Sequence, residues 1–104
     1  MRTTESLVRV AVALLDEPHG DHYGYPLGKR SGVRSGVLYP ILGRMLDEGW
    51  LTDTWESEGL AHAQGRRPRR IYHLTELGRR ELGAIESAAR QDARFKSMLP
   101  VRFS

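Results

Sequence analysis

Apolar residues recur at helical spacing in the first part of the chain. Between residues 4 and 15 they follow the i, i+3, i+4, i+7 pattern of an amphipathic helix, at Leu7, Val8, Ala11, Leu14 and Leu15. Thr3 or Thr4 can cap the first turn of this helix. Pro18 and Gly20 follow it, and both residues favour a turn that ends the helix.

Two further helices are predicted before the midpoint of the chain. The first is short, over residues 25–30, with Pro26 in its opening turn, where the missing N–H is tolerated. The second covers residues 35–48 and must start near its first residues, because Pro40 is not tolerated deep inside a helix. Gly49 is a natural stop. The apolar stripe of the second helix consists of Val37, Leu38, Ile41, Leu42, Met45 and Leu46.

The pattern changes from helix to strand after residue 49. Residues 50–56 and 69–74 are rich in aromatic and β-branched side chains and carry no helical stripe. The segment between them, residues 59–68, is polar and contains glycine. This arrangement predicts a β-hairpin with a long loop at its tip.

The last segment is predicted to be a long helix. Thr75 is a good N-cap, and Glu76 places a negative charge in the first turn. We expect the helix to extend through Met98 and Leu99 to Pro100. Its apolar stripe consists of Leu82, Ile85, Ala88, Ala89 and Phe95.

Such a helix carries more apolar surface than this small core can cover. We therefore expect a homodimer in which the last helix and the first helix form the interface. The predicted interface residues are Leu7, Val8, Leu82, Ile85, Ala89 and Phe95.

The order of elements predicts the fold class. Three helices, a hairpin and a long helix make a mainly α protein with a small β-hairpin, the layout of a winged helix-turn-helix with a long C-terminal dimerisation helix. The 104 residues leave room for one such domain. We expect a DNA-binding domain over residues 1–74 and a dimerisation helix with a tail over residues 75–104.

Composition excludes several classes of protein. The chain has no cysteine, which rules out a disulfide scaffold, a thiol nucleophile and a cysteine-based zinc site. The longest apolar run, residues 10–15, is far shorter than the roughly 20 residues that span a bilayer, and we find no signal peptide. No catalytic motif stands out. We expect a cytoplasmic protein that is not an enzyme, uses no cofactor and has no membrane partner.

Two other groups of residues have simple interpretations. The turn His19-Gly20-Asp21-His22 offers three potential metal ligands without a clear fourth, so a solvated turn is favoured over a metal site. Core packing is favoured over ligand stacking for the aromatic side chains of Trp50, Trp55, Tyr72 and Phe95.

Positive charge is concentrated near the tip of the predicted hairpin. The net charge is only +3, but Arg66, Arg67, Arg69 and Arg70 fall within five residues. Such a cluster can meet phosphates or a narrow minor groove. A solvated charge run that protects edge strands and a nuclear-localisation run are the alternatives.

The second and third helices have the spacing of a helix-turn-helix. In that motif the second helix enters the major groove with its N-terminal end toward the bases. The alternative is an ordinary helical hairpin with a solvated polar side. The residues expected to contact DNA from this end are Arg34, Ser35, Val37 and Tyr39, with Arg44 one face further along the helix.

Four motifs resemble those of the PadR family of bacterial transcriptional regulators, in particular its short members with a single C-terminal helix. They are Tyr23-Gly24-Tyr25, Gly36-Val37-Leu38-Tyr39-Pro40, residues 45–51 (MLDEGWL) and residues 65–78 (GRRPRRIYHLTELG). The chain departs from the family pattern in four places. Arg34 stands where serine is usual, Val37 replaces threonine, Pro26 and Gly28 weaken the second helix, and Arg67 is an extra residue.

The resemblance implies a winged-helix dimer with a recognition helix over residues 35–48 and a wing over residues 50–74. It also implies transcriptional repression, often relieved by a small aromatic or lipophilic effector. Tyr25, at the start of the second helix, joins the expected DNA-binding residues, and a palindromic operator in duplex DNA is the expected partner. Two alternatives stay open: a factor for replication, partition or a phage switch, and a winged helix used for protein–protein contact.

Overall fold

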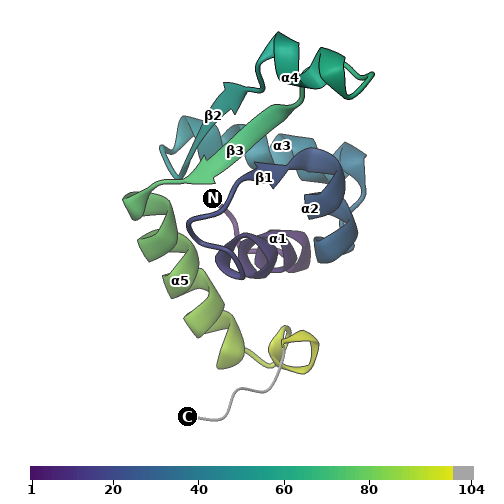
Figure 1. Cartoon of the computed structure of the whole chain (residues 1–104). Helices are drawn as coiled ribbons and strands as arrows, with labels where there is room; N and C mark the ends of the chain where they lie inside the picture. The colour runs from purple at the N-terminus through teal and green to yellow at the C-terminus, as the bar shows by residue number, and fades with distance from the viewer. Residues whose placement is uncertain (100–104) are drawn as a thin grey trace.

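The computed structural model describes residues 1–99 and extends over 47 × 29 × 23 Å (Figure 1). The first four elements lie in the N-terminal half. The wing and the C-terminal part follow. In chain order the elements are α1 Glu5–Leu15, β1 His22–Tyr23, α2 Gly24–Ser31, α3 Ser35–Asp47, β2 Leu51–Trp55, α4 Glu58–Ala63, β3 Arg70–Leu74, α5 Glu76–Arg90 and a short 3-10 helix Lys96–Met98.

Local capping residues set the helix ends where the sequence predicted them. Leu7 donates its backbone N–H to Thr4 Oγ1 at 3.1 Å at the start of α1, and Gly78 donates to Thr75 Oγ1 at 2.9 Å at the start of α5. Gly32 follows α2 with a φ of 72°, a conformation that favours glycine. The three predicted N-terminal helices are thereby confirmed.

Pro40 lies deeper in α3 than the sequence suggested. The helix begins at Ser35, so Pro40 occupies its second turn rather than its first. Proline has no N–H to donate to the carbonyl four residues earlier, which belongs to Gly36. That residue is exposed, so its carbonyl can bond to water instead.

The sheet has three antiparallel strands in the order β1-β3-β2, rather than the two that were predicted. The strand that was not predicted, β1, is only two residues long, and its His22 pairs with Tyr72 of β3. Such a segment is too short to show an alternating pattern. The predicted loop at the hairpin tip also differs, because its first half folds into α4, which Ser57 caps through the N–H of Leu60.

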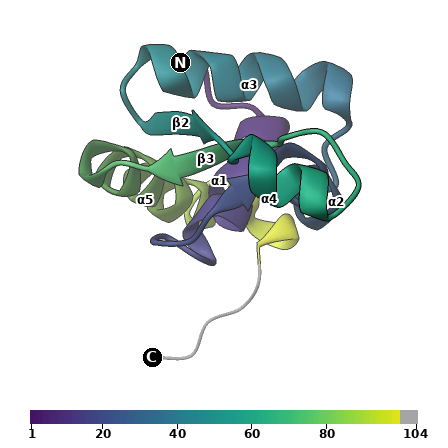
Figure 2. The same ribbon diagram turned by 45° about the horizontal axis from the view of Figure 1, so that its top comes forward.

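The core lies between the helices and one face of the sheet. Figure 2 shows α3 along one edge of the molecule with β2 beneath it. Leu14, Leu27, Leu42 and Met45 from the first three helices are fully buried in this core. No helix within residues 1–99 is both long and apolar enough to cross a membrane.

The prediction that the last helix continues through Phe95 is wrong. The helix α5 ends at Arg90, and the chain turns back toward α1. Asp92 stabilises the turn, because its carboxylate accepts the N–H of Arg94 at 2.9 Å and its carbonyl accepts the N–H of Phe95 at 3.0 Å. Such local bonds compete with a continuing helix.

The turn buries the apolar surface that the sequence left uncovered. Phe95 and Leu99 pack with Val8 and Ala89 in a second small cluster. Among the predicted interface residues only Ile85 is half-buried, and the other five are at most 5% exposed within a single chain, namely Leu7, Val8, Leu82, Ala89 and Phe95. The argument from uncovered surface is therefore wrong, although the homodimer itself stays a prediction.

Two glycines of α5 provide a test of how closely this helix approaches the wing. A Cβ on Gly78 would overlap the backbone carbonyl of Trp50, whereas a Cβ on Gly83 would meet open space. We expect Gly78→Ala to lower the free energy of unfolding by about 1–3 kcal/mol, as overpacking does. Gly83→Ala should raise it by up to about 1 kcal/mol, because alanine is the better helix former. Urea unfolding followed by circular dichroism measures both, and equal effects would contradict the close approach.

Candidate nucleic-acid interface

The outer face of α3 carries the residues that the sequence assigned to DNA. Arg34, Ser35, Tyr39 and Arg44 are exposed, and Val37 is 36% exposed. The opposite face of the same helix is buried through Leu38, Leu42 and Met45. The orientation of the helix is therefore as expected, and contact of these residues with DNA stays a prediction.

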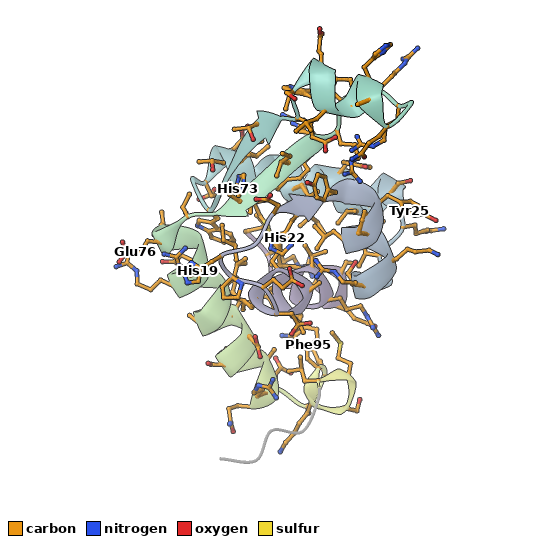
Figure 3. The ribbon with its side chains drawn as sticks, viewed as in Figure 1. His19, His22, Tyr25, His73, Glu76 and Phe95 are labelled. Atoms are coloured by element: carbon orange, nitrogen blue, oxygen red, sulfur yellow. The ribbon has the colours of Figure 1, made fainter. Side chains whose placement is uncertain are left out.

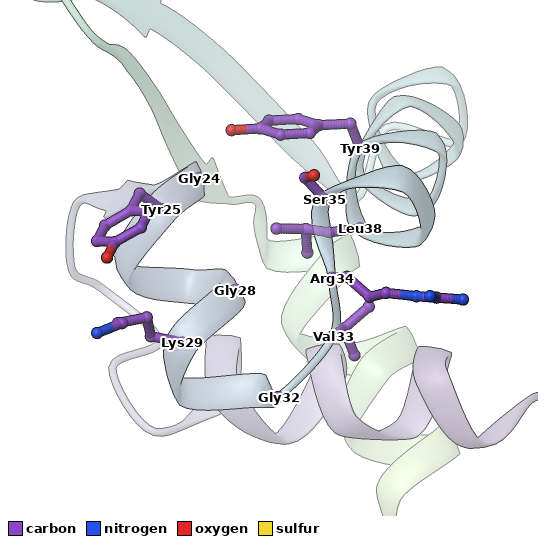
Figure 4. A pocket seen from close by; sticks show the side chains of 10 residues that line it. All are labelled: Gly24, Tyr25, Gly28, Lys29, Gly32, Val33, Arg34, Ser35, Leu38 and Tyr39. Carbon is purple, nitrogen blue, oxygen red and sulfur yellow. The ribbon is translucent and has the colours of Figure 1, made fainter.

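The start of α3 is open to an incoming group. Arg34 stands at the N-cap and makes no side-chain capping bond, and Figure 4 shows its side chain extending away from α2. The first N–H groups of α3 are therefore not occupied by a cap from Arg34. Backbone N–H groups in this position favour a phosphate.

The helices α2 and α3 enclose a groove of about 440 Å³ on the outer side of the helix-turn-helix. Gly28 lies at the closest approach, because a Cβ there would be 3.3 Å from the Val33 carbonyl oxygen and 3.4 Å from Leu38. The ring of Tyr39 extends from α3 toward the start of α2 (Figure 4). A Cβ on Gly24 would overlap the Tyr39 hydroxyl group, so Gly24 allows this packing.

Three of the four clustered arginines are paired within the wing. Glu56 accepts hydrogen bonds from the guanidinium groups of both Arg66 and Arg69, and also from the Arg69 backbone N–H at 2.9 Å. Arg70 pairs with Asp53 at 2.5 Å across the two strands. The side chain of Glu56 is only 10% exposed.

Three of these four charges are therefore partly neutralised within the chain. The acidic residues stand apart from the arginines in the sequence, but strand pairing brings Asp53 and Glu56 beside them. Within residues 1–99, Arg67 is the wing arginine that is exposed and forms no ion pair. The two arginines around Glu56 hold the pKa of its carboxyl well below the ordinary value of 4.5.

The aromatic residues divide between the core and the surface. Trp50, Tyr72 and Phe95 are buried, as expected from core packing. Trp55 is 67% exposed, so the expectation of core packing is wrong for this residue. It stands at the end of β2, beyond the part of the sheet that the helices cover, and lines a groove of about 540 Å³ with Tyr25, Tyr39 and Tyr72.

His22 is a buried structural residue (Figure 3). Its Nε2 lies 2.8 Å from the Glu17 carbonyl oxygen, and its Nδ1 lies 3.0 Å from Arg30 Nη2. Burial lowers the pKa of its imidazole. Arg30 can donate only to an unprotonated Nδ1, so the neutral tautomer fits this site. No group of three potential metal ligands is found in the described part of the chain.

Comparison with known proteins places the chain in a family. The model of the transcriptional regulator PadR-like family matches residues 12–84. The chain belongs to the PadR-like family of transcriptional regulators. It is therefore a DNA-binding regulator of transcription and not an enzyme. The comparison with curated proteins found no match.

Solved structures share the fold of this PadR-like chain. It is 24% identical to a protein from Streptococcus mutans UA159, with a TM-score of 0.65 and coverage of 100% of both chains. It is 22% identical to a PadR-like transcription factor from Bacteroides fragilis, with a TM-score of 0.62 and coverage of 92% of both chains. A PadR family transcriptional regulator from Eggerthella lenta DSM 2243 is 28% identical, with a TM-score of 0.58 and coverage of 79% of this chain and 74% of the other.

Sequence reasoning missed several residues of this PadR-like surface. Asp53 and Glu56 organise the wing, and only the strand register reveals their partners. Arg2 was missed as well. It lines a groove beside α3 together with Val37 and Arg44. The alternation of Asp53 and Trp55 with two threonines was a usable signal, since it puts both residues on one face of β2.

The ion pairs of Glu56 predict a pH dependence of stability. Because the folded pKa lies below the ordinary value, the unfolded chain binds a proton first as the pH falls. The contribution of Glu56 is therefore complete above about pH 4.5 and is lost as the pH falls toward the folded pKa. We expect Glu56→Gln to lower the melting temperature at pH 7, with a difference that shrinks below pH 4.5.

Thermal unfolding at pH 7 and at several acidic values measures this difference. The control is Glu81→Gln, which removes an exposed carboxylate on α5, outside the wing. It should leave the melting temperature unchanged. A constant effect of Glu56→Gln at every pH would contradict the ionic origin of the stabilisation.

Proposed function

We propose that this PadR-like chain is a repressor that acts as a homodimer on a palindromic operator. The observation that carries the proposal is the two-sided character of α3. One face is anchored in the core, while Arg34, Ser35, Tyr39 and Arg44 project from the other. A helix held in this way can enter the major groove without losing its packing. We propose that it acts in the cytoplasm, where it would meet its DNA partner.

Direct recognition would come from the exposed side of α3, including Arg44 farther along the helix. Arginine can donate two hydrogen bonds to guanine, and an exposed valine can contact the methyl group of thymine. Arg34 and Val37 offer these groups on the described surface. Arg67 and Lys29 are exposed and can meet phosphates on either side. Occupation of an operator that overlaps a promoter would exclude the polymerase.

An effector has less support than DNA binding. The resemblance implies a small aromatic or lipophilic ligand, and Trp50, Trp55 and Phe95 are the first aromatic side chains to examine for such a site, although core packing was favoured for each. Trp50 and Phe95 are buried within the chain, so neither offers a surface to a ligand in this conformation. The effector stays a prediction of the resemblance.

Selection of bound fragments from genomic DNA tests the proposal and yields the operator. We expect Arg44→Ala to weaken binding to this operator by about tenfold, in the range that loss of one specific arginine contact produces. Arg80→Ala is the matched control, because it removes the same charge from an exposed position on α5. Equal binding by the two variants would contradict the assignment of the outer face of α3, and the absence of any enriched DNA would contradict the function.

Homodimer formation has its own test. Two half-sites about 34–36 Å apart, one helical turn, require two copies of α3. In a dimer, Phe95 of one chain could pack on Val8 of the other chain instead of on Val8 of its own chain. The same two apolar surfaces would then bury each other across the interface. Light scattering at micromolar concentration should give twice the chain mass of 11.8 kDa. A mass equal to that of one chain, with and without operator DNA, would contradict the dimer.

A further inference from the structure

Three exposed aromatic side chains gather in one groove beside the recognition helix. Tyr25 is 74% exposed, Trp55 is 67% exposed and Tyr39 is 48% exposed. They come from α2, the wing and α3, and together they line the groove of about 540 Å³. We name it the aromatic groove; its other lining residues are Tyr23, Gly24, Pro26, Arg69, Arg70 and Tyr72. Aromatic surface left in water at one place marks an interaction site.

The register of the wing explains why Trp55 reaches this groove. Leu51 pairs with Leu74, Asp53 with Tyr72 and Trp55 with Arg70. These residues alternate along the strands and therefore lie on the same face of the sheet. Near the core this face is covered, since Leu51, Tyr72 and Leu74 are buried. Farther along the strands this face extends beyond the core. Trp55, at the end of β2, lies on this uncovered part of the face and is therefore exposed.

The arginines of the groove support its aromatic walls. The Arg69 guanidinium lies 4.1 Å from the centre of the Tyr23 ring, and Arg70 lies 5.6 Å from the Tyr72 ring and 6.0 Å from the Trp55 ring. Both guanidinium groups are also paired with carboxylates. The groove thus combines exposed ring faces with guanidinium groups whose charge is already partly balanced, so its occupant needs apolar surface and can also carry negative charge.

A duplex DNA strand has both properties, and the fold brings it to this place. Residues of α3, of the wing and of the start of α2 all line the aromatic groove. If α3 occupies the major groove and the wing lies at the adjacent minor groove, the strand that separates the two grooves must pass between them. That strand offers deoxyribose rings on its sides and phosphates at its outer edge.

We propose that the aromatic groove seats this sugar–phosphate strand, with the Trp55 ring packed on deoxyribose and the hydroxyl groups of Tyr25 and Tyr39 donating to phosphates. The proposal rests on the proposed function and adds the contact between the two DNA-reading elements. Lys29, whose Nζ lies 5.5 Å from the Tyr25 ring centre, brings an exposed charge to the same side of α2. These contacts carry no base information, so they position the protein on any sequence.

The fluorescence of Trp55 reports occupation of the groove directly. Trp50 is only 8% exposed, so Trp50→Phe leaves Trp55 as the single tryptophan. We expect acrylamide quenching of Trp55 to fall at least about threefold when a saturating operator duplex is added. Trp55→Phe is the matched control, because it leaves the buried Trp50, whose weak quenching should not change. If Trp50→Phe does not fold, the same measurement on the unaltered protein compares the total quenching with that of Trp55→Phe.

Affinity measurements separate this contact from base recognition. We expect Trp55→Ala to weaken binding to operator and to random duplex by the same factor, at least about fivefold for a buried tryptophan contact, with an unchanged dependence on salt. Arg67→Ala should instead reduce the salt slope by about one unit, as loss of a phosphate contact does. Trp55→Phe should retain most of the affinity, since its ring can still pack on a sugar.

The outcomes distinguish this proposal from the proposed function. If the unaltered protein binds no DNA, the function fails and the strand contact fails with it. If the protein binds its operator but Trp55 is quenched equally with and without DNA, only the strand contact is overturned. Protection of Trp55 by planar aromatic compounds, with none by DNA, would also overturn it and would assign the groove to a small ligand.

Discussion

The close contact between the first turn of α5 and the peptide of Trp50 holds the three functional parts together. Thr75 donates its backbone N–H to the Trp50 carbonyl at 3.0 Å and its hydroxyl to the Gly49 carbonyl at 2.6 Å. The N–H of Trp50 in turn bonds to the Met45 carbonyl at 2.8 Å, within α3. One junction therefore joins the end of the recognition helix, both ends of the wing and the start of α5. Gly78 permits this approach, because a side chain there would overlap the Trp50 carbonyl.

The sequence predicted those parts of the fold that depend on local interactions. Thr4, Gly32 and Thr75 act on their own neighbours in the chain, so the helix starts and stops were readable from residue type and spacing. The order of the elements gave the fold class, and the helix-turn-helix spacing gave the expected outer face of α3. The strand β1 and the tip helix α4 were missed, because β1 is two residues long and α4 is a six-residue helix inside a polar segment.

The errors arose where distant segments meet. Phe95 fits the apolar stripe of a continuing helix, yet the turn at Asp92 brings it onto Val8 instead. The ion pairs of the arginine cluster were not predicted, because the partners of Arg69 and Arg70 are 13 and 17 residues away. Trp55 was expected in the core because it is a large aromatic residue. It is exposed because the end of β2 lies beyond the part of the sheet that the helices cover. Neither strand register nor the depth of the core can be read from local composition.

The hydrogen bonds of Glu56 with Arg66 and Arg69 divide the wing into two parts. The base consists of the strands β2 and β3, and the tip consists of residues 57–65, whose sequence and length can change without changing the base. Glu56 donates its N–H to the Arg69 carbonyl at 2.9 Å and accepts from Arg66 and Arg69, so it closes the loop that carries α4. Once a loop is closed at its base, additional residues at the tip cost little, because closure entropy grows only slowly with length. Residues 57–65 therefore form a natural insertion point, where a peptide tag or a longer segment could be accommodated while the strands keep their register.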